Sequence, residues 1–407
     1  MIGIIYMASS KDNANSSRSL STIAAHGGER KGEQAFGAVV SPVFHSTIFS
    51  FKSFDELRSY ARGEMSDSYF YSRYANPTVS EVERTIAELE GAESAVVTSS
   101  GSAATFCALA ALCESGDEII ACETIYGGTT RIIEEVMGRF GITSRFIPIE
   151  DIPNLPEIAT ERSRAFWFET PTNPTNRLVD LELAADAAKA ANLFSITDNT
   201  FATPILQRPI EKGIDAVMHS ATKYLGGHSD LTAGAVAGTS DYIARVRRLA
   251  VLTGATLDPA AAYLLGRGIK TLDVRVRASC ANAMRLANAL RGNEKIARVY
   301  YPGLEDDAGH ALGKRQMSDF GGMVAFDLKG GEAEAENFLD ALKLIRCAPS
   351  LGGVETLVSY PLYSSHNGFS DEQLKSAGVS AGTVRLSLGI EAAEDIIADV
   401  EQALRNV

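Results

Sequence analysis

The chain has few cysteines and none of the close cysteine pairs that metal sites and redox motifs require. Its 407 residues include five, namely Cys107, Cys113, Cys122, Cys280 and Cys347. This odd, scattered set excludes a zinc finger and a C-x-x-C redox motif, and we expect no metal. It predicts reduced, mostly buried thiols and a cytoplasmic protein.

The sequence also lacks an excess of positive charge. It has 38 lysines and arginines against 51 aspartates and glutamates, so its formal net charge is −13. Nucleic-acid binding relies on Lys and Arg side chains that neutralise phosphates. We therefore expect no nucleic-acid partner, and a small-molecule substrate or a protein partner fits the charge better.

Long apolar runs are missing as well, and so are internal repeats and low-complexity tracts. The apolar run at residues 2–7 has no cationic flank before it and is too short to span a bilayer. We expect no membrane partner. We interpret the N-terminus as a leader in which Met7 is an alternative start to Met1.

The residues that are present suffice for two folded domains. With 407 residues, 45% hydrophobic and 22% charged, the chain is too long for one ordinary core. Residues 1–76 show no steady period, and we expect an N-terminal arm that packs on a neighbouring subunit. Residues 77–265 alternate strands and helices, which predicts an α/β domain with a mostly parallel sheet covered on both faces. Residues 266–407 predict a smaller C-terminal α+β domain.

Apolar runs and helical periods place the individual elements. In the α/β domain we expect strands at residues 95–98, 118–121, 166–169, 194–198, 216–219 and 233–237. Helices are expected before residue 91, at 103–113, 129–140 and 181–191, and from 242 onward. In the smaller domain we expect strands near 298–301, 322–328 and 383–388 and helices near 332–341 and 394–405.

The stretch of residues 220–229 follows one of the expected strands and contains Lys223. Open α/β sheets bind ligands at the carboxyl ends of their strands, and Lys223 lies just past such an end. The hydroxyls of Ser220 and Thr222 and a glycine pair after the lysine are what a phosphate-bearing cofactor bound covalently to a lysine needs. A surface lysine in a turn is the alternative interpretation.

Two other strand ends add to this pattern. Asp198 ends the preceding strand, and a carboxylate there would keep the ring nitrogen of an electron-sink pyridine cofactor protonated. Taken alone, Asp198 also fits a helix cap or a turn. The turn at residues 99–102 leads from a strand into a helix, whose free N–H groups and positive dipole end form an anion site. Three strand ends therefore predict one cofactor site.

Eight ordered motifs, spread from about His26 to the C-terminus, carry a resemblance to a known family. They are Tyr71-Ser72-Arg73 with Asn76-Pro77-Thr78, Ser100-Gly101, Tyr126-Gly127-Gly128-Thr129, Glu169-Thr170-Pro171-Thr172-Asn173-Pro174, Asp198-Asn199-Thr200, Ser220-Ala221-Thr222-Lys223-Tyr224, Ser350-Leu351-Gly352-Gly353 and Val384-Arg385-Leu386-Ser387. The chain resembles the pyridoxal-phosphate (PLP) enzymes of cysteine and methionine metabolism, which include cystathionine γ-lyase, cystathionine γ-synthase, methionine γ-lyase and the acylhomoserine sulfhydrylases. The resemblance implies the PLP-dependent transferase fold type I and a homo-oligomer, expected to be a homotetramer with active sites shared between subunits.

The resemblance also implies roles for single residues. Lys223 would bind pyridoxal 5′-phosphate covalently and act as a base, and Asp198 would pair with the ring nitrogen. Tyr126 would stack on the ring and act on the leaving group, and Asn173 would lie near the phenolic oxygen of the ring. The phosphate would be held by Gly101, Ser102, Ser220 and Thr222, together with Tyr71 and Arg73 from a neighbouring subunit. Ser102 stands where the family commonly has a methionine.

Substrate recognition depends on another set of residues in this resemblance. Arg385 would clamp the substrate carboxylate with its planar donor fork, and Ser350 is a further substrate-binding residue. Arg131 and Glu355 match positions where cystathionine-handling members carry Arg and Glu, and we expect them to bind the far end of the substrate. A solvated helix residue and a loop charge are the alternative interpretations of this pair.

Two departures weaken a dedicated methionine-cleaving role. Gly128 stands where methionine γ-lyases usually carry a cysteine, and Ala250-Val251 stand where they carry a Lys-Asp pair. We therefore expect a PLP-dependent γ-lyase that cleaves C–S bonds of cystathionine or related sulfur amino acids to a 2-oxo acid, ammonia and a thiol. The alternatives are a γ-replacing transferase, either a cystathionine γ-synthase or an O-acylhomoserine sulfhydrylase, and a methionine γ-lyase. The sequence does not separate elimination from replacement.

Two other classes of protein fit less well. Residues 378–382 match the G-x-S-x-G nucleophile pattern of serine hydrolases, which requires a strand, a turn and a helix in that order. Here a helix is expected before the motif and a strand after it, so we expect a connecting loop. A non-catalytic descendant of the family would have lost its chemical residues, whereas Lys223, Asp198, Tyr126 and Arg385 are all present.

Overall fold

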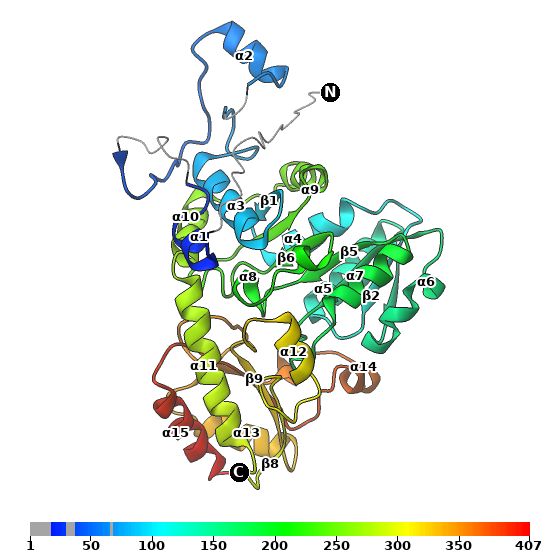
Figure 1. Ribbon diagram of the computed structural model, residues 1–407, viewed down its shortest axis with the longest axis vertical. Coiled ribbons are helices and arrows are strands. Elements are labelled where there is room, and N and C mark those ends of the chain that lie inside the picture. The colour runs from blue at the N-terminus through cyan, green and yellow to red at the C-terminus, as the bar shows by residue number, and fades with distance from the viewer. Residues whose placement is uncertain (1–17, 30–36, 66–67) are drawn as a thin grey trace.

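A seven-stranded sheet forms the centre of the larger domain (Figure 1). The computed structural model describes residues 18–29, 37–65 and 68–407, so Met1, Met7 and the expected leader lie outside the described residues. In spatial order the strands are β1 (Ser94–Thr98), β7 (Gly234–Gly238), β6 (Ala216–His219), β5 (Phe194–Asp198), β4 (Ser163–Glu169), β2 (Glu118–Cys122) and β3 (Thr143–Ile147). Strand β7 runs antiparallel to both of its neighbours, β1 and β6, and the other strand pairs of this sheet are parallel.

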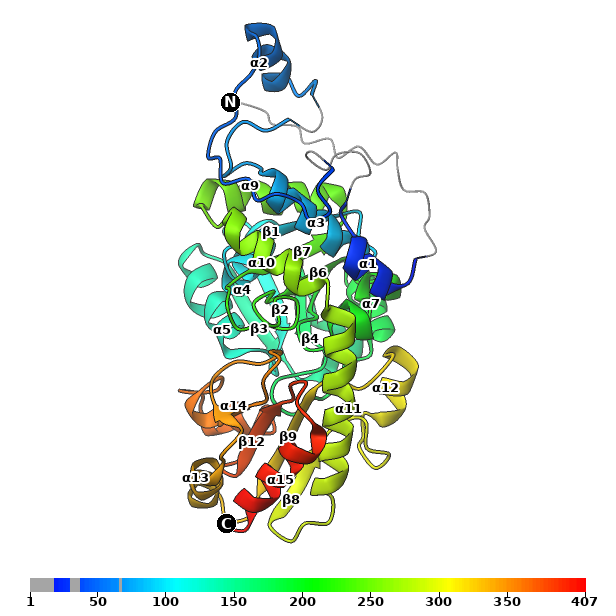
Figure 2. The same cartoon turned by 90° about the vertical axis from the view of Figure 1, so that its left-hand side faces the viewer.

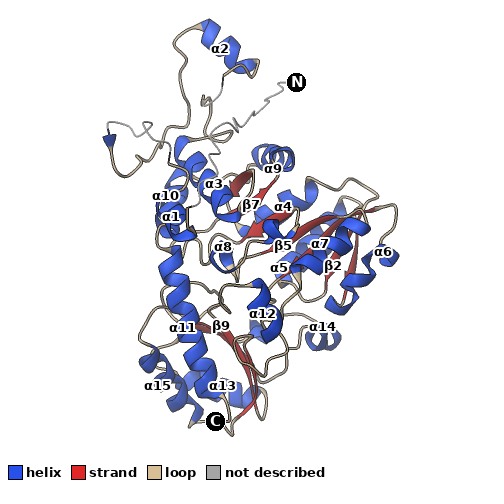
Figure 3. Cartoon of the chain, in the orientation of Figure 1, coloured by secondary structure: helices blue, strands red, loops and turns tan. Residues whose placement is uncertain are grey.

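Helices cover both faces of this sheet (Figure 3). Val96 in β1 packs into a core cluster on one face, whereas Ala95 and Val97 pack into the cluster on the other, because successive side chains alternate across a strand. The helical segments are α3 (Pro77–Glu90), α4 (Gly101–Ala110), α5 (Gly127–Arg131), η2 (Ile132–Met137), η3 (Ile149–Asn154), α6 (Leu155–Ile158), α7 (Leu181–Ala190), α8 (Thr203–Leu206), η4 (Pro209–Lys212), α9 (Ser240–Thr253) and α10 (Pro259–Ile269).

Local sequence explains where α3 begins and ends. The side chain of Asn76 accepts a hydrogen bond from the N–H of Thr78, and Pro77 occupies the first turn, where its missing N–H costs nothing. The helix ends at Gly91, whose φ of +69° is the left-handed conformation that glycine adopts without strain. These signals place Glu90, the last residue of α3, in the interior.

The smaller domain holds a five-stranded sheet (Figure 2). Its strand order is β10 (Arg346–Cys347), β11 (Leu357–Ser359), β12 (Thr383–Ser387), β9 (Met323–Leu328) and β8 (Ile296–Tyr300). Its helices are α11 (Leu272–Leu290), α12 (His310–Gln316), α13 (Glu332–Ala341), η5 (Pro361–Tyr363), α14 (Asp371–Ser376) and α15 (Ala393–Leu404). Helix α11 runs from the larger domain along the smaller one, and residue 265, where we placed the boundary, lies inside α10.

The expected fold class is confirmed, with differences in single elements. The strand β3 was not predicted, because its exposed and half-buried residues alternate without an apolar run. The helix expected at 129–140 is instead a short α-helix that continues as the π-helix η2. The strands β10 and β11 have only two and three residues, too few for a recognisable period. The G-x-S-x-G stretch lies between α14 and β12, so its reading as a connecting loop is confirmed.

The described part of the N-terminal arm divides into two parts. Helix α1 (Leu20–His26) buries Ile23 and Ala24 in the core of its own chain. Residues 37–65, with α2 (Phe54–Ala61), project away from both sheets and expose large apolar side chains, among them Val39, Ile48 and Phe54 (Figure 1). Within the described residues, no helix has the length and hydrophobicity needed to cross a membrane.

Candidate active site

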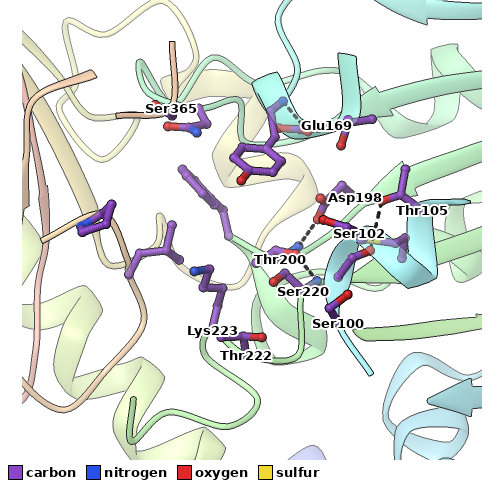
Figure 4. Close-up of a pocket in the computed structure, with 18 of the residues that line it drawn as sticks. Ser100, Ser102, Thr105, Glu169, Asp198, Thr200, Ser220, Thr222, Lys223 and Ser365 are labelled. Carbon is purple, nitrogen blue, oxygen red and sulfur yellow. Dashed lines mark hydrogen bonds between the residues drawn. The ribbon is translucent and has the colours of Figure 1, made fainter. Parts of the chain in front are cut away.

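A cavity of about 370 Å³ opens at the carboxyl ends of β4, β5 and β6 and is closed on another side by the smaller domain. Nine of the predicted site residues line it: Gly101, Ser102, Tyr126, Asn173, Asp198, Ser220, Thr222, Lys223 and Arg385. Figure 4 shows Lys223 directed into the cavity, with Asp198, Thr200 and Ser220 next to one another. Residues distant in sequence therefore meet where the strand-end pattern predicted a site.

Lys223 is held in the turn that follows β6. Its N–H donates to the carbonyl of Ser220 at 3.0 Å, and its Nζ donates to Oγ of Ser350 at 3.1 Å. Burial, with a contribution from the positive charge of Arg385, lowers the pKa of the Lys223 amine below its ordinary value. A larger fraction of the amine is therefore the neutral base at physiological pH. Ser350 accepts this hydrogen bond from Lys223, but it is not one of the described residues that line the cavity.

Two carboxyl groups lie at adjacent strand ends, where Glu169 of β4 is paired in register with Asp198 of β5. Burial raises the pKa of Asp198, while hydrogen bonds from Thr200 and the charge of His219 oppose the rise. Burial and the charge of Asp198 raise the pKa of Glu169 well above its ordinary value. Asp198 is thus the group with stabilising partners, and Glu169 is the one that retains its proton.

Glu169 is a site residue that sequence reasoning missed. Its Oε1 accepts a hydrogen bond of 2.6 Å from the N–H of Tyr126, so it fixes the backbone that carries the Tyr126 ring. The sequence did contain a clue to Glu169, because it is the last residue of a predicted strand, and that strand lies next to the one that ends at Asp198. Its motif was recognised, but the pairing of the two strands could not be seen in the sequence.

One end of the cavity is built to receive an anion. Ser100 caps α4 by accepting a hydrogen bond from the N–H of Ala103 at 3.2 Å, and the first N–H groups of the helix, from Gly101 and Ser102, have no intrahelical acceptor. A Cβ at position 101 would lie 2.9 Å from the Ser220 side chain, so this close approach requires glycine. The arrangement suits a phosphate group.

The turn after β6 supplies two hydroxyls to the same end. The N–H of Ser220 donates to Oγ1 of Thr200 at 2.8 Å, and the N–H of Thr200 donates to Oδ1 of Asp198 at 2.9 Å (Figure 4). Oγ1 of Thr222 accepts from the N–H of Ala233 at 2.9 Å and donates to its carbonyl at 3.1 Å. Thr222 therefore lines the cavity with a hydroxyl that the backbone of Ala233 holds in place.

A cationic group from the smaller domain lies at the other end. Arg385 of β12 is only 4% exposed, and it donates from Nη1 to Oδ1 of Asn173 at 2.7 Å and from Nη2 to the carbonyl of Ser350 at 3.2 Å. Burial lowers the pKa of the Arg385 guanidinium to about 10, so the group stays charged at neutral pH. Such a preoriented guanidinium suits a carboxylate ligand.

Besides Ser350, four predicted residues do not line the cavity of the described chain: Tyr71, Arg73, Arg131 and Glu355. Arg73 donates to the carbonyl of Val251 at 2.8 Å, and its guanidinium lies over the ring of Tyr74, which also contacts Tyr71. The placement of Tyr71 and Arg73 at the site of a neighbouring subunit stays a prediction. The other two, Arg131 and Glu355, are not brought together: Arg131 donates to the carbonyl of Asn367 at 2.9 Å, and Glu355 accepts from Oγ of Ser229 at 2.6 Å.

The donor set fits pyridoxal 5′-phosphate. The cavity combines a desolvated amine, a carboxylate with stabilising donors, an anion-binding helix end and a buried guanidinium. A phosphate ester of a pyridine aldehyde needs the first three, and an amino-acid carboxylate needs the fourth. Within the described residues, no group of three or more His, Cys, Asp or Glu side chains could hold a metal ion.

Comparison with known proteins identifies a family. Residues 21–405 match the family described as "Cys/Met metabolism PLP-dependent enzyme". The chain is 39% identical to an L-methionine gamma-lyase of Fusobacterium nucleatum subsp. polymorphum, over 95% of this chain and 98% of that protein. It is also 39% identical to a cystathionine gamma-lyase of Bacillus subtilis, over 95% and 99% of the two chains. The structure of a cystathionine gamma synthase from Xanthomonas oryzae pv. oryzae is similar with a TM-score of 0.90, at 35% identity and over 96% and 99% of the chains.

Proposed function

Because the chain belongs to the Cys/Met metabolism PLP-dependent enzymes, we propose that it is a γ-lyase that cleaves C–S bonds of cystathionine or related sulfur amino acids. The products are a 2-oxo acid, ammonia and a thiol. The observation that carries the proposal is the desolvated amine of Lys223, which lies in one cavity with Asp198 and the buried guanidinium of Arg385. Relatives named as γ-lyases cover nearly the whole chain.

The residues of the larger domain would hold the cofactor. Lys223 would bind it covalently, Asp198 would face the ring nitrogen, and Tyr126 would stack on the ring. The N–H groups of Gly101 and Ser102 and the hydroxyls of Ser220 and Thr222 would hold the phosphate, and Asn173 would lie near the phenolic oxygen. When bound, pyridoxal 5′-phosphate supplies an electron sink for the electron pair left at the substrate Cα.

The side chains of the protein would bind the substrate and transfer its protons. Arg385 binds the substrate carboxylate and so orients the Cα–H bond. The amine of Lys223 takes that proton, and its lowered pKa makes this possible near neutral pH. Loss of a second proton, from Cβ, supplies the electron pair that breaks the Cγ–S bond, and the Tyr126 hydroxyl would give a proton to the departing sulfur. One water molecule completes the balance, since its oxygen enters the 2-oxo acid as ammonia leaves.

The choice of substrate rests on the site and not on overall similarity. Relatives named L-methionine gamma-lyase are 38% to 41% identical to this chain and one named cystathionine gamma-lyase is 39% identical, so identity alone does not select between the two substrates. Gly128 supports cystathionine, because the methionine-specific members that the chain resembles usually carry a cysteine there. Replacement at Cγ is the second candidate, because a cystathionine gamma synthase and a cystathionine gamma-lyase have equally similar structures, with TM-scores of 0.90 and 0.89.

A product assay tests the proposed function. The purified protein is offered cystathionine, methionine, and O-acetyl- or O-succinylhomoserine with and without cysteine or sulfide. We expect 2-oxo acid and ammonia from cystathionine, with the thiol in equal amount. A thioether formed from the acylhomoserines without any 2-oxo acid would replace the lyase by the transferase.

Lys223→Ala tests the cofactor residue. We expect the absorption band of the lysine-bound cofactor to disappear and turnover to fall by a factor of about 10² to 10⁴ or more, because both the covalent anchor and the base are lost. Spectra and initial rates of the purified variant provide the measurement. If the band of the bound cofactor survived, another residue would be the anchor.

The assembly and location of the protein are parts of the same proposal. Tyr71 and Arg73 lie away from the cavity of their own chain, and residues 37–65 expose apolar side chains, which supports a homo-oligomer with shared sites, expected to be a homotetramer. The cysteines of the described chain are unpaired, which supports a cytoplasmic location.

A further inference from the structure

A group of buried polar side chains lies directly behind the cavity wall, and the proposed reaction does not use it. Glu90, at the end of α3, has no exposed surface, and its Oε1 lies 2.5 Å from Nε2 of His219 and 3.1 Å from Nδ2 of Asn199. Asn199 also accepts a hydrogen bond from Nε2 of Gln207 at 3.0 Å, and the same nitrogen donates to the carbonyl of Thr170 at 2.7 Å.

Two residues of this group, Asn199 and His219, lie at strand ends, and each is adjacent in sequence to a residue that lines the cavity. Asn199 follows Asp198, and His219 precedes Ser220. Successive side chains at a strand end point to opposite sides, so one residue of each pair faces the cavity and the other faces Glu90. One carboxylate therefore ties together the ends of β5 and β6, which carry Asp198 and Ser220.

The charge of Glu90 needs compensation. A carboxylate without access to water is very costly unless a cation and hydrogen bonds accompany it. Oε2 of Glu90 has no hydrogen-bond partner among the described residues, so compensation falls on the groups at Oε1. Of these, Asn199 is neutral, and the His219 imidazole can carry the positive charge in a short charge-assisted hydrogen bond.

The remaining charged groups around the pair are few. On the cavity side they are Asp198, Glu169, Lys223 and Arg385. The guanidinium of Arg208 lies near Gly91 at the end of α3, but it is paired with Glu211. The charge of His219 acts on Asp198, where it opposes the effect of burial on the pKa. A cation at His219 thus favours the ionised form of Asp198.

We propose that Glu90 and His219 form a buried ion pair that positions the strand ends carrying Asp198 and Ser220 and keeps the Asp198 carboxylate ionised. Neither residue lines the cavity, so both are positioning residues. The link to Asp198 rests on the proposed function, since that function requires an anion opposite the ring nitrogen. The ion pair itself does not depend on the reaction.

Histidine NMR on the wild-type protein tests the ion pair without any substrate. The chain has six histidines, and the two buried ones are His219 and His366. Burial lowers the pKa of His366 to about 4, so its imidazole is neutral. With ¹⁵N-labelled histidine we expect one imidazole that stays doubly protonated from pH 6 to 8 and that is missing in His219→Asn. If no imidazole stays doubly protonated across that range, the ion pair does not exist.

Glu90→Gln tests the consequence for the site, with Glu83→Gln as the matched control. Glu83 is a buried carboxylate on the same helix, but it accepts hydrogen bonds from Arg247 and from the N–H of Val97 in β1, and not from the ends of β5 and β6. For Glu90→Gln we expect pyridoxal 5′-phosphate to bind the cofactor-free protein about tenfold more weakly, because the substitution removes one charge-assisted hydrogen bond. For Glu83→Gln we expect unchanged cofactor affinity.

The pH dependence of the bound cofactor separates positioning from general destabilisation. In Glu90→Gln the transition on the acid side of its absorption should move to higher pH, because Asp198 then protonates more readily. Turnover should fall more than KM rises. Equal behaviour of Glu90→Gln and Glu83→Gln in affinity and spectrum would overturn the proposal, and if Glu90→Gln does not fold, His219→Asn and the wild-type NMR result decide it. A product assay that favoured the transferase would leave these outcomes unchanged.

Discussion

Glu169 and Asp198 lie side by side at the ends of β4 and β5, and burial raises the pKa of both. Two adjacent carboxylates with little access to water do not both ionise readily. The bonds from Thr200 favour the ionised form of Asp198, whereas Glu169 accepts only the N–H of Tyr126 in the described structure. The two carboxyl groups therefore differ: Asp198 is the one whose ionised form has hydrogen-bond donors, as the proposed role at the ring nitrogen requires, and Glu169 is the neutral acid that holds the backbone of Tyr126.

The neutral acid predicts a pH-dependent stability. The pKa of Glu169 lies well above its ordinary value of 4.5 in the folded protein, so folding binds a proton. The stabilisation is complete below about pH 4.5 and is lost as the pH rises through the folded pKa. Glu169→Gln cannot ionise, and we expect its free energy of unfolding to exceed that of the wild type by about 1 to 3 kcal/mol at pH 8 and by little at pH 5. Urea unfolding of the cofactor-free proteins measures this, and a difference independent of pH would contradict it.

The absence of a side chain at Gly128 leaves room for the ring of Tyr126. A Cβ at position 128 would overlap Cε1 of that ring, so any larger residue forces the ring to move. We expect Gly128→Ala and Gly128→Cys to lower kcat/KM for cystathionine about tenfold, which corresponds to the 1 to 3 kcal/mol cost of overpacking. The matched control is Gly138→Ala, where a Cβ meets nothing within 4 Å. Rates of both variants equal to the control would show that the ring position does not matter.

Among the elements, the start of α5 and the loop between η5 and α14 form the rim of the cavity. The loop contributes Ser364 and Ser365 to the lining, and Arg131 of α5 holds it through the carbonyl of Asn367 at 2.9 Å. Ser376 of α14 also donates to Glu123 of the larger domain. Side chains therefore join the two domains across the rim. Of these, Arg131 was predicted to bind the substrate, and Ser376 and Glu123 had no predicted role.

This contact is an alternative to the substrate-binding role that the resemblance predicts for Arg131. If Arg131 holds the rim loop, Arg131→Met should raise KM for methionine and for cystathionine alike, by about three- to tenfold. If Arg131 instead binds the far end of cystathionine, only the KM for cystathionine should rise. Initial rates with both substrates distinguish the two. Arg139→Met on the same helical run is the control, because Arg139 makes no hydrogen bond or ion pair with a described residue.

At the scale of the whole molecule, the projecting arm is the feature that a single chain does not explain. Residues 37–65 expose Val39 by 93% and Phe54 by 70%, and Ile48 is also exposed. Apolar surface of this kind is covered by another subunit in most soluble proteins that have it. The arm leads directly into Tyr71 and Arg73, the two predicted phosphate ligands that do not reach their own cavity.

Mixed oligomers test whether the sites are shared. Arg73→Ala and Lys223→Ala are each expected to be nearly inactive alone, because each lacks one part of every site. After co-expression, random pairing should restore about a quarter of the wild-type activity, since half of the dimers are mixed and each has one intact site. Activity no higher than the mean of the two variants would place all site residues in one chain.

The parts of the site that depend on neighbours along the chain could be predicted without a structure. Lys223, Asp198 and the turn at Gly101 follow strand ends, and parallel strands bring their carboxyl ends to one edge, so their order was sufficient to predict a shared site. The same local signals predicted α3 and its end at Gly91. Hydrophobic period and turn residues act over a few positions and can be read without a structure.

Only the tertiary structure decided what each side chain meets. The pairing of Glu169 with Asp198 and of Glu90 with His219 joins residues that are 29 and 129 positions apart. The protonation of Glu169 and Asp198 follows from burial and from the nearest charge, and both depend on how strands and helices pack. Arg131 could not be placed from its position in a helix, because its partner is a loop of the other domain. The sequence therefore identified the chemistry, and packing determined its charge states.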